Sequence, residues 1–215
     1  MKRLALLAFI WGWSFLFIKV AVEGMTPPTV AAARVGLGAL VLYGVLRARG
    51  GSLPRSPRLW RDATVAAVFG SVVPFTLLAW GEQRITSALT AVLNASTPLF
   101  TAVAAGLLLR DRLKPVQAIG LVVSMAGVGV AAGLGGEDLA HSSFWGSTAA
   151  VGAGACYGIA FAWMRRHLTG VAPLCASTVQ LIAATVLLAP FALATSIGPG
   201  IQLTPPRLGA VLLLG

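Results

Sequence analysis

Residues 86–109 read TSALTAVLNASTPLFTAVAAGLLL, and this stretch decides the fold class of the chain. It contains no Asp, Glu, Lys or Arg. A helix of roughly 20 mostly apolar residues is long enough to cross about 30 Å of hydrocarbon. A transmembrane strand would instead alternate apolar and polar residues over about 10 positions, which this stretch does not do. The stretch therefore predicts a membrane-spanning helix.

The composition of the whole chain agrees with a membrane protein. Of its 215 residues 57% are hydrophobic and 10% are charged, and the mean hydropathy is +0.87. Soluble domains carry about 25% charged residues, so too little polar sequence remains here to cover a water-soluble core. Disorder is excluded by the same numbers. The two cysteines, Cys156 and Cys175, are too few for a disulfide scaffold or a multi-cysteine metal site.

Further stretches have the same character as residues 86–109. They are residues 4–22, 29–46, 63–81, 115–133, 145–164 and 172–195, and an eighth stretch begins near Leu208. No small-x-small cleavage site follows residues 4–22, so this stretch is interpreted as a retained helix and not as a signal peptide. The sequence thus predicts an all-α polytopic membrane protein with seven complete spans and the start of an eighth.

The basic residues alternate between the connectors in a regular way. If the N-terminus is cytoplasmic, twelve of the 16 Lys and Arg residues fall on the cytoplasmic side: Lys2, Arg3, Arg47, Arg49, Arg55, Arg58, Arg61, Arg110, Arg112, Lys114, Arg165 and Arg166. The positive-inside rule therefore predicts a multi-pass protein of the bacterial inner membrane with a cytoplasmic N-terminus and a periplasmic connector at residues 134–144. A nucleic-acid surface would interleave aromatic residues with the charges, and the 47–61 loop offers only Trp60, so no nucleic-acid partner is expected.

A weak internal repeat appears when the sequence is shifted by 146 residues. The identical pairs are Gly12 with Gly158, Phe15 with Phe161, Gly24 with Gly170, Pro27 with Pro173 and Leu42 with Leu188, and Arg34 meets Gln180. The first copy holds five spans, so a second copy must enter the membrane from the opposite side, which is the pattern of inverted-repeat transporters. We expect a first repeat at residues 1–133 and an incomplete second repeat at residues 145–215, because a complete copy would end near position 279.

Three motifs carry a family resemblance. Trp11-Gly12-Trp13-Ser14-Phe15, followed by Lys19, Pro27 and Arg34, resembles the opening of the drug/metabolite transporter superfamily, specifically its EamA-type members. Residues 88–102 resemble the fourth helix of that family, and residues 109–120 resemble the loop and fifth helix that follow, with Arg110-Asp111 where the family often has Gly-Glu. The resemblance implies ten helices in two inverted five-helix repeats and the transport of small metabolites or drugs.

Polar residues recur on one side of the 86–109 stretch. They are Ser87, Thr90, Asn94, Thr97 and Thr101. Polar groups that face lipid are costly, so such a stripe indicates either close helix packing or a wet cavity. The side-chain amide of Asn94 needs hydrogen-bond partners at mid-depth in the membrane. Pro98 clashes with the main-chain carbonyl of Asn94, which lies four residues before it. We therefore place Asn94, Thr90 and Thr97 on the substrate pathway. By the same mechanism Pro74 is expected to free the Gly70 carbonyl.

Two cations lie inside predicted spans. Lys19 and Arg34 are near the outer ends of their stretches, where long basic side chains either snorkel to the headgroups or flank an outer mouth that favours anionic or zwitterionic solutes. Glu82 ends the neighbouring stretch and is the nearest candidate for proton exchange, with Lys19 as its partner. Arg34 and Glu82 are assigned to the outer mouth, and Lys19 to the substrate pathway.

Aromatic residues complete the candidate pathway. Trp11 and Phe15 share a helix face, and Tyr157 is the repeat counterpart of Trp11. Trp11 and Tyr157 are too deep for the interfacial belt in which membrane proteins usually place Trp and Tyr. Ala150, Gly154, Gly158 and Ala162 form a small-xxx-small ladder that predicts helix packing.

The function expected is therefore a carrier that exports or exchanges small molecules by alternating access. The chain has no P-loop, no metal-ligand cluster and no cofactor motif. An intramembrane enzyme is disfavoured because no nucleophile and base converge at depth. The alternative is a truncated, non-transporting remnant or a subunit that needs a partner. Two arrangements stay open: a homodimer, or a second chain that completes the bundle.

Overall fold

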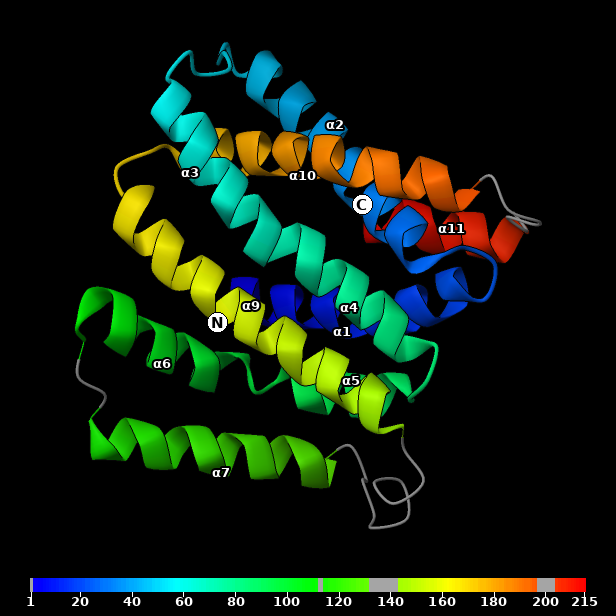
Figure 1. The fold of residues 1–215 in the computed structure, drawn as a ribbon, viewed down its shortest axis with the longest axis vertical. Coiled ribbons are helices and arrows are strands. Elements are labelled where there is room, and N and C mark those ends of the chain that lie inside the picture. Colours follow the sequence, from blue (N-terminus) through cyan, green and yellow to red (C-terminus); the bar gives the residue numbers. More distant parts are fainter. Residues whose placement is uncertain (1, 112–113, 132–142, 197–203) are drawn as a thin grey trace.

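A computed structural model describes residues 2–111, 114–131, 143–196 and 204–215 (Figure 1). Every regular element in these ranges is a helix. The elements are α1 (Lys2–Val22), α2 (Pro27–Ala48), α3 (Pro57–Ala67), η1 (Val68–Val72), α4 (Val73–Glu82), α5 (Ser87–Asn94), α6 (Thr97–Leu109), α7 (Pro115–Ala131), α9 (Phe144–His167), α10 (Pro173–Ser196) and α11 (Pro205–Leu214).

Five segments of the described chain are long and apolar enough to span a membrane. They are Pro27–Ala48, Pro57–Glu82, Ser87–Leu109, Phe144–His167 and Pro173–Thr195. These correspond to five of the seven predicted spans: 29–46, 63–81 and 145–164 lie inside them, and 86–109 and 172–195 begin one residue earlier. Of the other two, residues 4–22 and 115–131 are helical as α1 and α7, and within the described residues their apolar segments are Gly12–Val22 and Pro115–Gly127. The prediction of an all-α polytopic membrane protein is confirmed, whereas the count of seven complete spans is not.

Short connectors end in hydroxyl residues that begin the next helix. The side chains of Ser56, Thr86 and Ser143 accept backbone N–H groups three residues ahead, at 3.5, 3.2 and 3.3 Å. Proline begins α2, α3, α10 and α11, where its missing N–H has no helical partner to lose. These caps explain why turns of a few residues are enough to reverse the chain between spans.

The span Pro57–Glu82 is interrupted at η1, a wide turn of π-helix. The N–H of Val73 bonds to the carbonyl of Val68, five residues back. Pro74 follows directly and has no N–H to offer the Gly70 carbonyl, as the sequence predicts. Isolated π turns often mark functional positions because they change the direction in which the next side chains point.

The span Ser87–Leu109 is not one continuous helix. It breaks at Ala95 and Ser96, between α5 and α6. The hydroxyls of Ser96 and Thr97 donate to the carbonyls of Leu93 and Asn94 at 2.6 and 2.7 Å, which satisfies acceptors that lost their helical donors. The single polar stripe expected along this stretch is therefore divided between two helices.

Helix α9 lies close to α6, and glycine is the reason. An added Cβ at Gly158 would stand 2.6 Å from the carbonyl carbon of Phe100. At Gly154 it would stand 3.0 Å from the Ser96 hydroxyl. Backbones can approach this closely only where side chains are absent. The small-residue ladder on α9 therefore packs helices, as the sequence predicts.

Helices α2 and α10 cross in opposite directions and share an apolar core (Figure 1). That core consists of Ala31, Val35, Ala67, Ala183, Ala184 and Leu188. Gly36 faces the Thr185 methyl group, and Gly38 faces Leu181. The Thr26 and Thr195 hydroxyls lie 2.9 Å apart where α2 begins and α10 nears its end.

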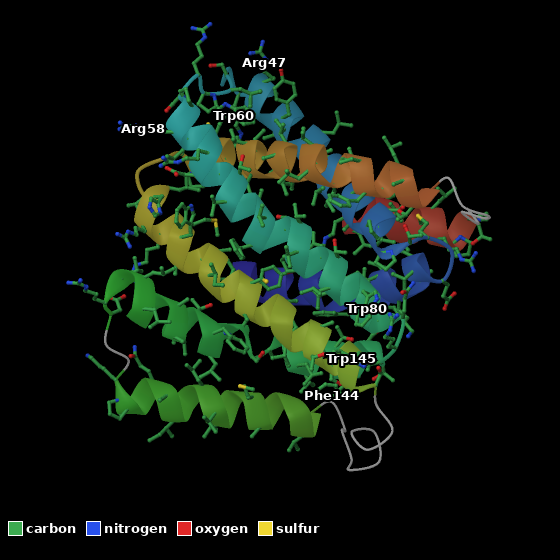
Figure 2. All side chains as sticks on the ribbon, in the orientation of Figure 1. Arg47, Arg58, Trp60, Trp80, Phe144 and Trp145 are labelled. Carbon is green, nitrogen blue, oxygen red and sulfur yellow. The ribbon has the colours of Figure 1, made fainter. Side chains whose placement is uncertain are left out.

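Basic residues gather at one end of the helices, whereas aromatic residues occur at both ends (Figure 2). In Figure 2 the labelled Arg47, Arg58 and Trp60 lie at one end, and Trp80 and Trp145 lie at the other. The Arg165 side chain forms an ion pair of 2.6 Å with Asp111, so the ends of α9 and α6 meet as well. This agrees with the expectation that the basic connectors share one side of the membrane, while the identity of that side stays a prediction.

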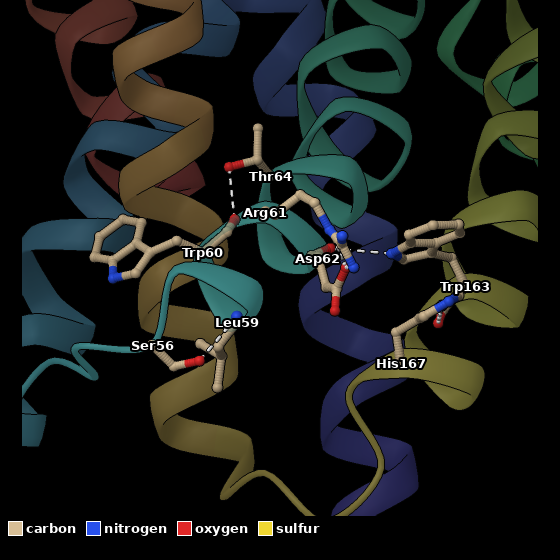
Figure 3. A network of polar contacts seen from close by, with 8 residues as sticks. All are labelled: Ser56, Leu59, Trp60, Arg61, Asp62, Thr64, Trp163 and His167. Atoms are coloured by element: carbon tan, nitrogen blue, oxygen red, sulfur yellow. Dashed lines mark hydrogen bonds and ion pairs between the residues drawn. The ribbon is translucent and has the colours of Figure 1, made fainter.

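A polar network joins α3 to α9 at the basic end (Figure 3). The indole N–H of Trp163 donates to the main-chain oxygen of Asp62 at 3.1 Å, and the His167 ring stacks on Trp163 with ring centroids 3.8 Å apart. The Asp62 carboxylate accepts from the adjacent Arg61 at 3.0 Å. The network fixes α9, which belongs to the second predicted repeat, against α3, which belongs to the first.

Candidate functional site

A partly buried cation on α2 contacts the neighbouring helix α4. Arg34 is the eighth residue of α2, about 10 Å along the helix from Pro27 at 1.5 Å per residue. Its guanidinium carbon lies 4.2 Å from the centroid of the Phe75 ring on α4. The Tyr157 ring on α9 meets the same Phe75 ring edge-on, with centroids 6.4 Å apart. Arg34, Phe75 and Tyr157 are called the Arg34 cluster below.

No described carboxylate forms an ion pair with Arg34. A charged side chain inside a membrane helix is costly, by about 2.5–3.5 kcal/mol at the helix centre on insertion scales and by less toward the ends. A cation–π contact away from water contributes about 2 kcal/mol, which offsets part of that cost. The Arg34 cluster therefore leaves a partly compensated positive charge that an anion would stabilise.

Lys19 occupies a different place from Arg34. Its ammonium group donates to the main-chain oxygen of Glu82 and, at 3.2 Å, to that of Ile85. These carbonyls lie at and just beyond the C-terminal end of α4, where the helix dipole favours a cation. Lys19 thus binds the end of a neighbouring helix, and the two cations contact different residues.

The Glu82 side chain is fully buried, with 0% of its surface exposed. One carboxylate oxygen accepts from the Ser87 hydroxyl at 3.1 Å, and the other has no partner among the described residues. Ser87 also lies 3.4 Å from the main-chain oxygen of Phe15. The structure therefore places Lys19 on the main chain of Glu82 and not in an ion pair with its carboxylate, and proton exchange between them stays a prediction.

The hydroxyls of the predicted polar stripe bond mainly to nearby backbone. Thr90 donates to the Thr86 carbonyl at 3.0 Å, and Thr101 to the Thr97 carbonyl at 2.8 Å. Asn94 differs from them, because its side-chain oxygen is buried without a hydrogen-bond partner among the described residues. An orphaned amide oxygen beside a helix break is a candidate ligand for a polar solute.

Phe15 and Tyr157 pack against one apolar cluster. Its buried members are Leu78, Ile85, Leu89, Ala150 and Ala153. Tyr157 also stacks on Phe161, with centroids 6.4 Å apart. Trp11 lies in α1, but its side chain lies outside the residues whose side chains the structure describes.

Neither Phe75 nor Ser71 was singled out from the sequence, and Gln180 was noted only as the repeat counterpart of Arg34. Phe75 forms the cation–π contact, and Gln180 donates to the buried Ser71 hydroxyl at 3.4 Å beside the wide turn of η1. Two sequence signals pointed to them: Pro74 marks the helix interruption, and Gln180 is the repeat counterpart of Arg34. Neither signal identifies a contact partner, because these residues are distant in the sequence.

Two other features lie away from the cluster. A pocket of about 480 Å³ at the basic end is lined by Leu107, Leu108, Leu109, Arg110 and Arg166. Among the described residues no group of three His, Cys, Asp or Glu side chains could hold a metal ion. The Arg34 cluster itself presents one guanidinium, one phenol and aromatic rings.

Comparison with known proteins gives consistent relatives. The chain is 29% identical to PagO of Salmonella typhimurium, over 56% of this chain and 40% of that protein. It is 26% identical to the uncharacterized inner membrane transporter YedA of Escherichia coli K12, over 57% of this chain and 40% of that one. A probable terminal-alkyne amino-acid exporter of Streptantibioticus cattleyicolor is 26% identical, over 80% of this chain and 58% of the exporter. The chain thus matches about two fifths to three fifths of the length of these curated relatives.

A solved crystal structure of another protein has the same fold. It aligns with a TM-score of 0.69 over 96% of this chain and 70% of its own, at 22% sequence identity. Residues 3–132, which are more than half of the chain, match the EamA-like transporter family. The predicted resemblance is confirmed: this chain belongs to the EamA-like transporter family and is a multi-pass membrane protein.

Proposed function

We propose that this chain is part of a carrier that moves small metabolites or drugs across the bacterial inner membrane. The carrier works by efflux or exchange, with two inverted halves exposing a central site to each side in turn. Its N-terminus is cytoplasmic, and no ATP hydrolysis by this chain is involved. The protein that contains the chain has ten helices in this proposal, in keeping with a chain that matches only part of its relatives' length.

The observation that carries the proposal is the pairing of α2 with α10. The 146-residue repeat makes these helices equivalent, and they cross antiparallel near the middle of both, where Gly36 meets Thr185 and Gly38 meets Leu181. A two-fold axis in the membrane plane relates equivalent helices in this way. The same shift of 146 residues makes α1 the counterpart of α9, and α3 the counterpart of α11. The contact of α1 with α11 therefore corresponds to that of α9 with α3. The contact of α11 with α2 corresponds in the same way to that of α3 with α10.

The names of two relatives are in keeping with a carrier. One is named a probable terminal-alkyne amino-acid exporter, which is the reason for proposing efflux, and another an uncharacterized inner membrane transporter. The proposed pathway passes the broken span at Asn94, Thr90 and Thr97, and the aromatic residues Trp11, Phe15 and Tyr157. Interrupted helices at the interface of inverted repeats are a common place for substrate sites, because their free backbone groups can bind solutes. Lys19 and Glu82 lie at one end of this pathway.

The proposal is tested by the sidedness of single cysteines. In the full-length protein with Cys156→Ser and Cys175→Ser, the variants Ser52→Cys, Lys114→Cys and Thr169→Cys are exposed to a membrane-impermeant maleimide on intact cells. All three should be protected until the membrane is opened, and the matched variant Gln83→Cys should react at once. If Thr169→Cys reacts on intact cells as Gln83→Cys does, the second half is not inverted and the proposal fails.

A further inference from the structure

Two arginines in the described part of the chain stack on aromatic rings, and the contrast between them is informative. The Arg84 guanidinium lies 3.6 Å from the Trp80 ring centroid, donates to the Trp80 carbonyl at 2.8 Å and is exposed. The Arg34 guanidinium lies 4.2 Å from the Phe75 centroid and is partly buried among α2, α4 and α9. No hydrogen bond joins it to any described residue. Arg84 is an ordinary surface residue, whereas Arg34 keeps its donors available inside the bundle.

The acids in the described ranges are all engaged or placed elsewhere. Asp62 pairs with Arg61, and Asp111 pairs with Arg165, both at the basic end. Glu82 accepts from Ser87 at the end of α4, and Glu23 is exposed beyond the end of α1. The Tyr157 ring meets edge-on the same Phe75 ring over which the Arg34 guanidinium lies. No carboxylate in the described ranges therefore pairs with Arg34.

We propose that Arg34 binds the carboxylate of the transported solute, and that the solute has one carboxylate on an apolar or aromatic body. The planar guanidinium can donate two parallel hydrogen bonds to a carboxylate, which a lysine cannot do. The Tyr157 hydroxyl supplies a further donor, and the rings of Phe75 and Phe161 accept the body of the solute. This assignment deepens the proposed function and rests on it.

The test measures equilibrium binding to the purified full-length protein in detergent. The probe is radiolabelled phenylacetate, and the competitor is phenylacetamide, which has the same shape but no charge. The wild type should bind phenylacetate saturably, and phenylacetamide should not displace it. Arg34→Gln should weaken binding by roughly 10- to 100-fold, the size expected for a lost charge-assisted hydrogen bond. Arg34→Lys should lose less, because it keeps the charge but not the paired donors.

The controls separate this inference from a fold defect and from the proposed function. Arg84→Gln removes the exposed arginine and should bind as the wild type does. Tyr157→Phe is a second, milder variant of the site, and it should weaken phenylacetate binding severalfold. It keeps the test possible if Arg34→Gln does not fold. Because binding needs no flux, a protein that binds phenylacetate through Arg34 but transports nothing contradicts only the proposed function.

Three results overturn the carboxylate assignment. The first is undiminished phenylacetate binding by folded Arg34→Gln. The second is the absence of saturable phenylacetate binding to the wild type. The third is displacement by inorganic phosphate as effective as displacement by unlabelled phenylacetate, which would make the site a general anion site. A protein that shows any of these and still transports neutral solutes retains the proposed function without the carboxylate site.

Discussion

The ammonium group of Lys19 donates a hydrogen bond to the main-chain oxygen of Glu82, 63 residues further along the chain. It also donates to Ile85, so a single cation on α1 joins the end of α4 to the turn that leads into α5. The buried Glu82 carboxylate lies beside it, held by Ser87 of α5. Three segments that the sequence separates are fastened together at one end of the bundle.

Removal of this cation should lower stability and leave solute preference alone. Lys19→Gln loses charge-assisted hydrogen bonds and a favourable helix-end charge, together about 1–3 kcal/mol. The midpoint of thermal unfolding in detergent should fall by several degrees, and Lys19→Arg should retain most of the difference. Flux of anionic and neutral solutes should decline in equal proportion. A selective loss of anionic solutes would instead place Lys19 in the solute site.

Asn94 should matter for transport more than for folding. Its side-chain oxygen is buried without a described partner, so Asn94→Ala removes no protein hydrogen bond that this oxygen accepts. In the full-length protein, flux should fall at least tenfold with unchanged expression, which corresponds to about 1.4 kcal/mol of lost solute interaction. Thr101→Val is the matched control, since the Thr101 hydroxyl bonds to the Thr97 carbonyl, and its flux should be unchanged. Equal flux in Asn94→Ala and wild type would remove Asn94 from the pathway.

The contact between α9 and α6 should not tolerate a methyl group at Gly158. A Cβ there would stand 2.6 Å from the Phe100 carbonyl carbon, so Gly158→Ala must separate two backbones. We expect about 1–3 kcal/mol of destabilisation, measured as a lower unfolding midpoint. Gly152→Ala is the control on the same helix, because its Cβ would meet only a Leu77 methyl group at an ordinary 3.6 Å. If both variants unfold at the same temperature, the two helices are not held at this distance.

The indole of Trp163 should stabilise the basic end of the bundle. Trp163→Phe keeps an aromatic ring beside His167 but loses the hydrogen bond to the Asp62 carbonyl, a change of about 1 kcal/mol. Asp111→Asn, which breaks an ion pair between exposed side chains, should change stability by less than about 1 kcal/mol. The unfolding midpoints of the two variants measure this difference. A larger effect of Asp111→Asn would show that the surface ion pair is the stronger connection.

The sequence predicted those features of the fold that depend on residues close together in the chain. Charge-free apolar stretches predicted the spans because the bilayer imposes both length and composition. Pro74 predicted the interruption at Gly70, since a missing N–H acts on the helix that contains it. The break at Ala95 and Ser96 lies beside Pro98, whose clash with the Asn94 carbonyl the sequence also predicted, but a proline does not reveal whether a helix bends or divides into two.

The sequence predicted several residues of the candidate site, but it did not predict which of them are in contact. The polarity of Asn94 and the charge of Arg34 stand out in apolar sequence, so both were identified. Their surroundings depend on helices far away in the chain: Phe75 reaches Arg34 from α4, and Tyr157 from α9. Lys19 and Arg34 were grouped by depth alone, although their side chains bind different partners. Periodicity describes one helix at a time and carries no information on which helices meet.

Accessibility of position 94 from the two faces of the membrane tests alternating access most directly. Asn94→Cys in the full-length protein without Cys156 and Cys175 is treated with a membrane-impermeant maleimide, in right-side-out vesicles and in inside-out vesicles. We predict labelling in both preparations, because a carrier exposes its central site to each side in turn. Labelling from one face only, or from neither, would contradict the account.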